Sequence, residues 1–189
     1  MQLICFDLDG TLINSIDGIY NSLKYACTKN NFKLTPKDNL IAQIGPPLKT
    51  YLNKVISDEI NYKQFDKVIS DFRFHHNKKG FRNYKLYPGA LELLKYIKNQ
   101  NSLNQIFIVT NKPYLLSRKS ITFLKINEFI DELYSIDGSS DNKFIWSKYY
   151  SNSKHNILKF IENKVSNSFG YYYIGDTLDD LLATKYTKF

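Results

Sequence analysis

Short apolar runs alternate along the chain with stretches in which apolar residues recur at helical spacing. Three such runs, Leu3–Phe6, Ile106–Val109 and Tyr171–Ile174, each end in polar residues, which is typical of buried strands. A further short strand is expected within Phe129–Ile136. This alternation predicts an α/β fold with a parallel sheet. Amphipathic helices are expected between the strands over Ala90–Lys98, Pro113–Phe123 and Ser153–Asn163.

The chain between the first and second apolar runs has helical character. The pattern predicts helices over Ile16–Ala26 and Glu59–Lys79, and the Gly45-Pro46-Pro47 segment separates two more. No strand pattern occurs between Ser15 and about Gln105. We therefore expect a compact helical bundle inserted into the sheet domain. The expected domains are an α/β core of residues 1–15 and 84–189 and a helical unit of residues 16–83.

The composition is compatible with one α/β domain that carries a small accessory domain. The 189 residues are 43% hydrophobic, which is enough to bury a sizeable core. No apolar run is long enough to span a bilayer and no cleavable leader is visible, so we expect a cytoplasmic protein without a membrane partner. Cys5 and Cys27 are expected to be reduced apolar residues, not disulfide partners.

The net charge of +8 raises the question of an anionic partner. Nucleic-acid-binding proteins usually concentrate their basic residues, whereas the lysines here are scattered, as in Leu23–Leu34. The aromatic residues make up 15% of the chain and are spread through the predicted elements, which favours core packing over base stacking. We therefore predict no nucleic-acid partner, and we interpret the positive field as an aid in attracting phosphorylated substrates.

The first apolar run breaks off at two acids. Asp7 and Asp9 are two residues apart, so along an extended chain they point to the same side. Like charges held together in a partly dry site repel each other and need a cation, and Mg²⁺ prefers carboxylate and phosphate oxygens. The alternative is an ordinary Asp-Gly turn with solvated acids.

Polar residues also follow the other two apolar runs. In an open α/β sheet, ligands bind outside the carboxyl ends of the strands, so these polar groups can converge with the first acids. Three strands that end in complementary polar groups favour a functional site. The residues are Asp176, Asp179 and Asp180 after the last run, and Thr110, Asn111 and Lys112 after the middle run.

At these positions the sequence resembles the haloacid dehalogenase-like superfamily of phosphohydrolases, over nearly the whole chain. The resemblance depends on FDLDGT at 6–11, VTNKP at 109–113, GDTLDD at 175–180 and a lysine at the head of a helix. YPGALELLKYI at 87–97 and IGPPLKTYL at 44–52 look like the phosphoglycolate phosphatase-like branch. The resemblance implies a Rossmann-like parallel sheet core in which the helical unit is a cap over the active site.

The resemblance and the residue types together imply a Mg²⁺-dependent phosphatase that hydrolyses a small phosphomonoester through an aspartyl-phosphate. Asp7 would be the nucleophile, and Asp9 would be the general acid and then the general base. Asp7, Asp176 and the main-chain carbonyl of Asp9 would hold the Mg²⁺ ion. Asp180 would not bind the metal directly but would orient the metal's water ligands or a lysine side chain.

Four residues are expected to bind the phosphate group. A helix start at Gly10 and Thr11 would offer backbone N–H groups. A hydroxyl, an amide and an ammonium would bind further oxygens, since the remaining negative charge needs a cation. The residues are Gly10, Thr110, Asn111 and Lys154, with Lys143 and Lys148 as alternatives to Lys154.

Other interpretations stay open at this point. A sugar phosphomutase would share both first aspartates, and a shortened non-catalytic binding or regulatory relative would keep the fold.

The chain ends at Phe189, about one helix after the last acidic motif, where relatives usually continue. The Gly45-Pro46-Pro47 segment and Lys49 either lie over the leaving group or only separate two helices. His75 and His76 are expected at a polar helix end on the surface. Neither the physiological substrate nor the oligomeric state is predicted.

Overall fold

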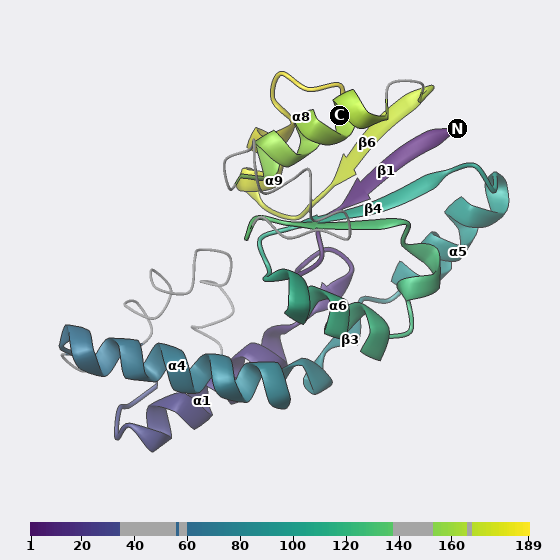
Figure 1. Cartoon of the computed structure of the whole chain (residues 1–189). Helices are drawn as coiled ribbons and strands as arrows, with labels where there is room; N and C mark the ends of the chain where they lie inside the picture. Colours follow the sequence, from purple (N-terminus) through teal and green to yellow (C-terminus); the bar gives the residue numbers. More distant parts are fainter. Residues whose placement is uncertain (35–55, 57–59, 138–152, 166–167) are drawn as a thin grey trace. The chain divides into compact units, whose positions relative to one another are not determined.

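The structure is a computed structural model, and it describes residues 1–34, 56, 60–137, 153–165 and 168–189 (Figure 1). The chain divides into two compact units, which we call the sheet unit (Met1–Asn14 and Lys85–Phe189) and the helical unit (Ser15–Tyr84). The role of the helical unit as a cap stays a prediction. The helices expected on either side of the Gly-Pro-Pro segment lie outside the described residues. So do six of the residues named in the sequence analysis: Gly45, Pro46, Pro47, Lys49, Lys143 and Lys148.

The sheet unit contains a four-stranded parallel sheet, which confirms the predicted α/β fold. Its strand order is β5-β4-β1-β6, so the first strand of the chain lies between β4 and β6. Phe6 of β1 pairs with Ile108 of β4 and with Ile174 of β6, and the residues that follow these three strands therefore lie at one end of the sheet. The strands are β1 Gln2–Phe6, β4 Gln105–Thr110, β5 Glu132–Ser135 and β6 Gly170–Ile174.

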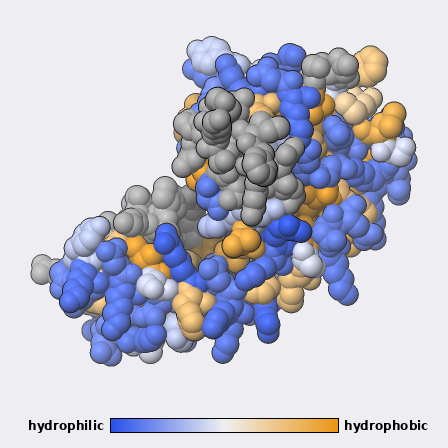
Figure 2. All heavy atoms as spheres, in the orientation of Figure 1, coloured by the Kyte–Doolittle hydropathy of each residue, from blue (hydrophilic) through white to orange (hydrophobic). Residues whose placement is uncertain are grey.

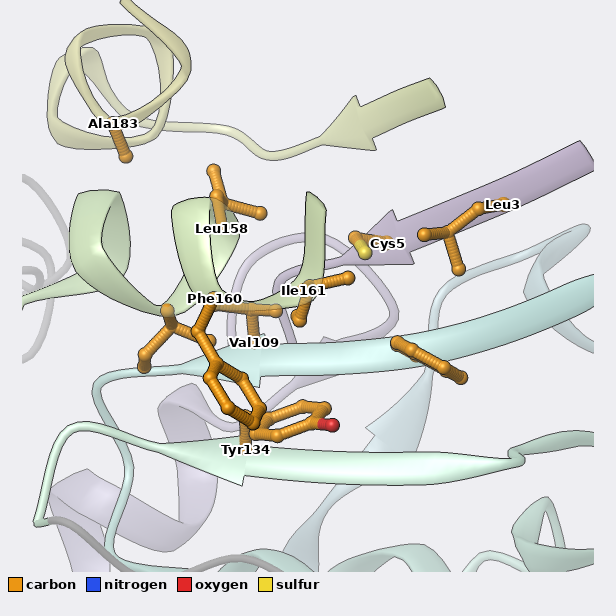
Figure 3. Packing of buried hydrophobic residues seen from close by; sticks show 10 residues of the cluster. Leu3, Cys5, Val109, Tyr134, Leu158, Phe160, Ile161 and Ala183 are labelled. Atoms are coloured by element: carbon orange, nitrogen blue, oxygen red, sulfur yellow. The ribbon is translucent and has the colours of Figure 1, made fainter. Parts of the chain in front are cut away.

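Helices of the sheet unit alternate with its strands along the chain. They are α5 Ala90–Gln100, α6 Tyr114–Phe123, the short 3-10 helix η2 Asn127–Phe129, α8 Lys154–Lys164 and α9 Leu178–Thr184. One face of the sheet is packed against α8. Figure 3 shows Ile161 of this helix beside Val109 of β4, and Leu158 of α8 and Cys5 of β1 belong to the same buried cluster. This packing fixes the start of α8 close to the end of β1.

Two very short strands were not expected from the sequence. β2 Ile13–Asn14 and β3 Lys85–Leu86 pair antiparallel, and the Tyr87 N–H donates to the Leu12 carbonyl at 3.0 Å. The prediction that no strand occurs between Ser15 and about Gln105 is therefore wrong, because β3 lies in this stretch. A two-residue strand has no period that a sequence pattern can reveal, because alternation needs about four residues.

The helical unit is organised around two helices that pack against each other. α1 Ile16–Lys29 and α4 Tyr62–Lys78 share a core that includes Leu23, Val68 and Phe72, and the short 3-10 helix η1 Gly80–Asn83 follows α4. Asn61 begins α4 with a capping box: its side chain accepts from the Gln64 N–H, and the Gln64 side chain accepts from the Asn61 N–H.

A buried polar network links α1 to the end of the helical unit. Ser22 Oγ donates its single proton to the Gly18 carbonyl at 2.7 Å, so it accepts from Nδ1 of His76 at 2.9 Å and from Nδ1 of His75 at 3.1 Å. Nε2 of His76 forms a hydrogen bond of 2.6 Å with the Tyr84 hydroxyl. The prediction of a surface position is therefore wrong for His76, which is 5% exposed. His76 lies on the buried face of α4, but its neighbours in the sequence are polar, so the sequence pattern does not indicate this position.

Hydrophilic residues predominate in the face shown in Figure 2, and hydrophobic residues lie between them. None of the helices in the described part of the chain has the length and apolarity of a membrane span. Cys5 and Cys27 are both buried free thiols, as predicted. β6 has one strand neighbour among the described strands, and its Tyr172 and Ile174 side chains are exposed.

Candidate active site

Asp7 follows β1 directly and is buried at the end of the sheet. Its Oδ1 atom is buried and accepts no hydrogen bond, although the Lys154 Nζ atom lies 3.1 Å away. Burial raises the pKa of Asp7 to about 6, and the Lys154 ammonium opposes this shift. The carboxylate therefore has an uncommitted oxygen beside a cation, in a site that is largely shielded from water.

Lys154 is the first residue of α8, and Ser153 caps the helix by accepting the Asn156 N–H. The Lys154 side chain is 5% exposed and reaches two carboxylates, since its Nζ also donates to Asp180 Oδ1 at 2.5 Å. A lysine is rarely this buried unless it is paired. The helix cap and the two carboxylates therefore hold one cation at a defined place in the site.

Asp180 lies in the first turn of α9 and has both of its oxygens occupied. Oδ1 accepts from Lys154 and, at 2.7 Å, from the Tyr173 hydroxyl. Oδ2 accepts from Thr177, through its N–H at 3.0 Å and its hydroxyl at 2.6 Å. Burial acts to raise the pKa of Asp180, but the hydrogen bonds from Lys154, Thr177 and Tyr173 together hold it below its ordinary value. Asp180 is thus a charged anchor for Lys154.

Asp176 precedes α9 and is exposed. Its Oδ1 accepts from the Thr11 hydroxyl at 2.9 Å. Asp7, Asp176 and Asp180 each offer a carboxylate oxygen, and these oxygens lie within 4.8 Å of one another. Acids from the two ends of the chain therefore converge, as the sequence predicts. Three close carboxylates with one ammonium form an oxygen-rich, net negative group, which suits a hard divalent cation.

Asp9 is held by Lys112, which the sequence analysis placed among the polar residues at the strand ends without giving it a role. Lys112 Nζ donates to both Asp9 oxygens, at 2.6 and 2.9 Å, and the Lys112 side chain is 4% exposed. Lys112 lies in the VTNKP segment, two residues after β4. The position of Lys112 shortly after a strand indicated that it could lie near the site. Sequence spacing alone, however, does not show which acid the lysine contacts.

The predicted phosphate-binding residues differ in their placement. Thr110 ends β4 and is buried, and its Oγ1 accepts from the Lys112 N–H at 3.2 Å. Asn111 is exposed next to it. The helix start predicted at Gly10 and Thr11 is wrong, because α1 begins at Ile16 and a turn occupies these positions. In that turn the Gly10 N–H donates to the Ile13 carbonyl at 2.9 Å, so this amide is already hydrogen-bonded.

Gly10 is instead required for a close approach of the chain to Asp176. Its φ angle is +89°, which favours glycine, and a Cβ atom added there would lie 2.2 Å from Asp176 Oδ2. Tyr87 also lies near these acids: burial raises the pKa of its hydroxyl, and so do the negative charges of Asp176 and Asp9. The observed position of the Asp176 carboxylate therefore requires a glycine at position 10.

Residues 4–188 match the family model of haloacid dehalogenase-like hydrolases. The chain belongs to this family. Among curated relatives, it is 26% identical over 185 residues to the phosphoglycolate phosphatase of Aquifex aeolicus, a match that covers 98% of this chain and 80% of the relative. It is 25% identical over 137 residues to the pyrophosphatase PpaX of Halalkalibacterium halodurans, covering 72% of this chain and 60% of that relative.

The fold of this haloacid dehalogenase-like chain is also found among solved structures. A haloacid dehalogenase-like family hydrolase from Streptococcus pneumoniae aligns with a TM-score of 0.77 at 24% identity, covering 98% of this chain and 80% of that one. At this identity the likeness shows a shared fold. The family match and the relatives together support the phosphoglycolate phosphatase-like branch that the motifs suggested.

Proposed function

We propose that the chain is a Mg²⁺-dependent phosphatase that hydrolyses a small phosphomonoester through an aspartyl-phosphate. The observation that carries the proposal is the buried Asp7 carboxylate, whose Oδ1 accepts no hydrogen bond and lies 3.1 Å from the Lys154 ammonium. An oxygen in this state is available as a metal ligand or as a nucleophile, and the cation beside it offsets the charge of a phosphoryl group. The family match supports a hydrolase.

The metal ion would be held by Asp7, Asp176 and the main-chain carbonyl of Asp9. This donor set fits Mg²⁺, because the ion prefers oxygen and is commonly held by one or two carboxylates together with a substrate phosphate. The bound ion would neutralise negative charge on the phosphoryl oxygens. Asp180 is the third acid of the cluster, but its oxygens are engaged by Lys154, Tyr173 and Thr177, so we assign it the positioning of Lys154.

In the reaction, one Asp7 oxygen would form a bond to phosphorus while the bond from phosphorus to the ester oxygen breaks. Asp9 would donate a proton to the leaving oxygen and later accept one from the water that hydrolyses the aspartyl-phosphate. Lys154, the Thr110 hydroxyl and the Asn111 amide would bind the phosphoryl oxygens. The Gly10 amide is omitted from this set because it is bonded to the Ile13 carbonyl.

The substrate would be a small phosphorylated metabolite. Two curated relatives are named for phosphoglycolate and pyrophosphate hydrolysis, and both names denote small anions that carry a phosphoryl group. The helical unit would act as the cap that admits such a molecule and excludes larger ones.

The test is turnover of p-nitrophenyl phosphate with Mg²⁺ by the wild type and by Asp7→Asn. Asp7→Asn should lower kcat by at least about 10³-fold, because the covalent route is lost with the nucleophile. Asp179→Asn is a matched control, since Asp179 is an exposed acid on α9 and should leave kcat unchanged. Equal rates for wild type and Asp7→Asn would refute the proposal.

A further inference from the structure

The Tyr173 hydroxyl lies in the site, but the proposed reaction gives it no role. It is 2.7 Å from Asp180 Oδ1, to which it donates, and it also lies 3.4 Å from the Val109 carbonyl. Tyr173 pairs with Cys5 of β1, and Val109 belongs to β4, so the phenol side chain reaches from β6 across the central strand. The sheet therefore fixes this hydroxyl beside the Asp180 carboxylate.

The direction of the hydrogen bond between Tyr173 and Asp180 is fixed by the charges of the two groups. Burial raises the pKa of Tyr173, and the negative charges of Asp7 and Asp180 raise it further. Asp180 is ionised, because its hydrogen bonds hold its pKa below the ordinary value, and a carboxylate can only accept. The phenol therefore stays protonated and acts as a donor to Asp180.

One oxygen of Asp180 is shared by two donors. The Lys154 ammonium donates to Oδ1 at 2.5 Å, and the Tyr173 hydroxyl donates to the same atom. The negative charge of this oxygen is divided between the two donors, so each is held less strongly than it would be alone. Lys154 Nζ also lies 3.1 Å from Asp7 Oδ1, which accepts no hydrogen bond. The strength of the Asp180 contact therefore decides how readily the ammonium turns towards Asp7.

Tyr171 lies two residues earlier on β6 and provides a contrast. Residues two apart in a strand point to the same face, and both tyrosines are half-buried against the cluster that contains α8. The Tyr171 hydroxyl, however, donates to the main-chain carbonyl of Val165 at the end of α8. One tyrosine thus fastens the strand to the helix, whereas the other contacts the ion pair beside Asp7.

We propose that Tyr173 is a positioning residue that controls how the Lys154 ammonium is divided between Asp180 and the phosphoryl group that Asp7 attacks. Its hydrogen bond takes up part of the charge on Asp180 Oδ1, so the ammonium can leave this oxygen for the phosphoryl oxygens of the substrate. Without the hydroxyl, Asp180 holds the ammonium more tightly. This inference rests on the proposed phosphatase function.

The kinetic test is a double-mutant cycle on the turnover of p-nitrophenyl phosphate at saturating Mg²⁺. Tyr173→Phe keeps the ring and its packing, and it should lower kcat about tenfold, the effect of one hydrogen bond to a charged group. In a Lys154→Met background the same change should alter kcat by less than about twofold, because the lysine through which it acts is absent. Tyr171→Phe removes the same hydroxyl from the same strand and should leave kcat unchanged in both backgrounds.

A second measurement follows Lys154 without any turnover. In protein with isotope-labelled lysines, the side-chain ammonium resonance of Lys154 is identified by NMR through its absence from Lys154→Met. Tyr173→Phe should shift this resonance, because the lysine then has Asp180 Oδ1 to itself. Tyr171→Phe should leave the resonance in place.

Three outcomes would overturn the inference. The first is a wild-type kcat in Tyr173→Phe. The second is an equal loss of kcat with and without Lys154, since the hydroxyl would then act independently of the lysine. The third is an unchanged Lys154 resonance in Tyr173→Phe. If the wild type does not hydrolyse p-nitrophenyl phosphate with Mg²⁺, the phosphatase function itself fails, while the resonance still reports whether Tyr173 controls Lys154.

Discussion

The Lys154 ammonium lies 3.1 Å from Oδ1 of Asp7, although the two residues come from opposite parts of the chain. Asp7 directly follows β1, and Lys154 is the first residue of α8. Because α8 packs against the sheet, the sheet and the helix together set the distance between these two residues. In the proposed reaction, a cation held so close to Asp7 would stabilise the charge of the transferring phosphoryl group.

Lys154→Met should therefore lower kcat for p-nitrophenyl phosphate by about 10²- to 10³-fold, the range seen when one preorganised charge-stabilising group is lost. Steady-state kinetics at saturating Mg²⁺ measures this effect. Lys159→Met is the matched control, because Lys159 is exposed on the same helix and should leave kcat unchanged. A folded Lys154→Met protein with wild-type kcat would contradict the assigned role.

The glycine at position 10 offers a second prediction, with an internal control. Gly10 and Gly89 have φ angles of +89° and +83°, so alanine at either site should cost about 1–2 kcal/mol of stability from backbone strain. A Cβ at position 10 would collide with the Asp176 carboxylate, whereas one at position 89 meets no atom within 4 Å.

Gly10→Ala should therefore lose phosphatase activity in addition to stability, while Gly89→Ala should lose stability alone. Urea denaturation and kinetics on the same preparations separate the two effects. Equal activities in the two variants would show that the approach of Gly10 to Asp176 is irrelevant to the site.

The sequence predicts the strand ends well because a buried parallel strand needs a continuous apolar run and a loop needs polar residues. Asp7, Thr110 and Asp176 stand at such transitions, so their convergence was visible without coordinates. The Lys112 pairing with Asp9 was not, because it depends on which way a side chain turns after β4. The buried position of His76 was missed for a similar reason, since it depends on packing between α1 and α4.

Asp176→Ala should raise the Mg²⁺ concentration needed for half-maximal activity by at least about tenfold and also lower the maximal rate, because a direct carboxylate donor is lost. Titration of activity with Mg²⁺ checks this expectation. Asp179→Ala provides the comparison, since it removes an exposed acid of the same motif. An unchanged Mg²⁺ titration in Asp176→Ala would refute its assignment as a metal ligand.

The burial of Asp7 predicts a pH-dependent stability in metal-free protein. Its pKa is about 6 in the folded chain and 3.8 for the free side chain, so the folded state binds the proton more tightly. Above pH 6 the ionised carboxylate therefore destabilises the fold by about 3 kcal/mol, and this penalty disappears as the pH falls from about 6 towards 3.8.

Asp7→Asn carries no such charge, so in EDTA it should be more stable than wild type by up to about 3 kcal/mol at pH 8 and nearly equal to it at pH 4. Urea denaturation of both proteins at pH 8, 6 and 4 measures the difference, in which the titration of the other carboxylates largely cancels. Mg²⁺ should narrow the gap at pH 8, because it binds the wild-type carboxylate and stabilises the folded state. A difference that stays constant across this pH range would show that Asp7 does not titrate as its burial implies.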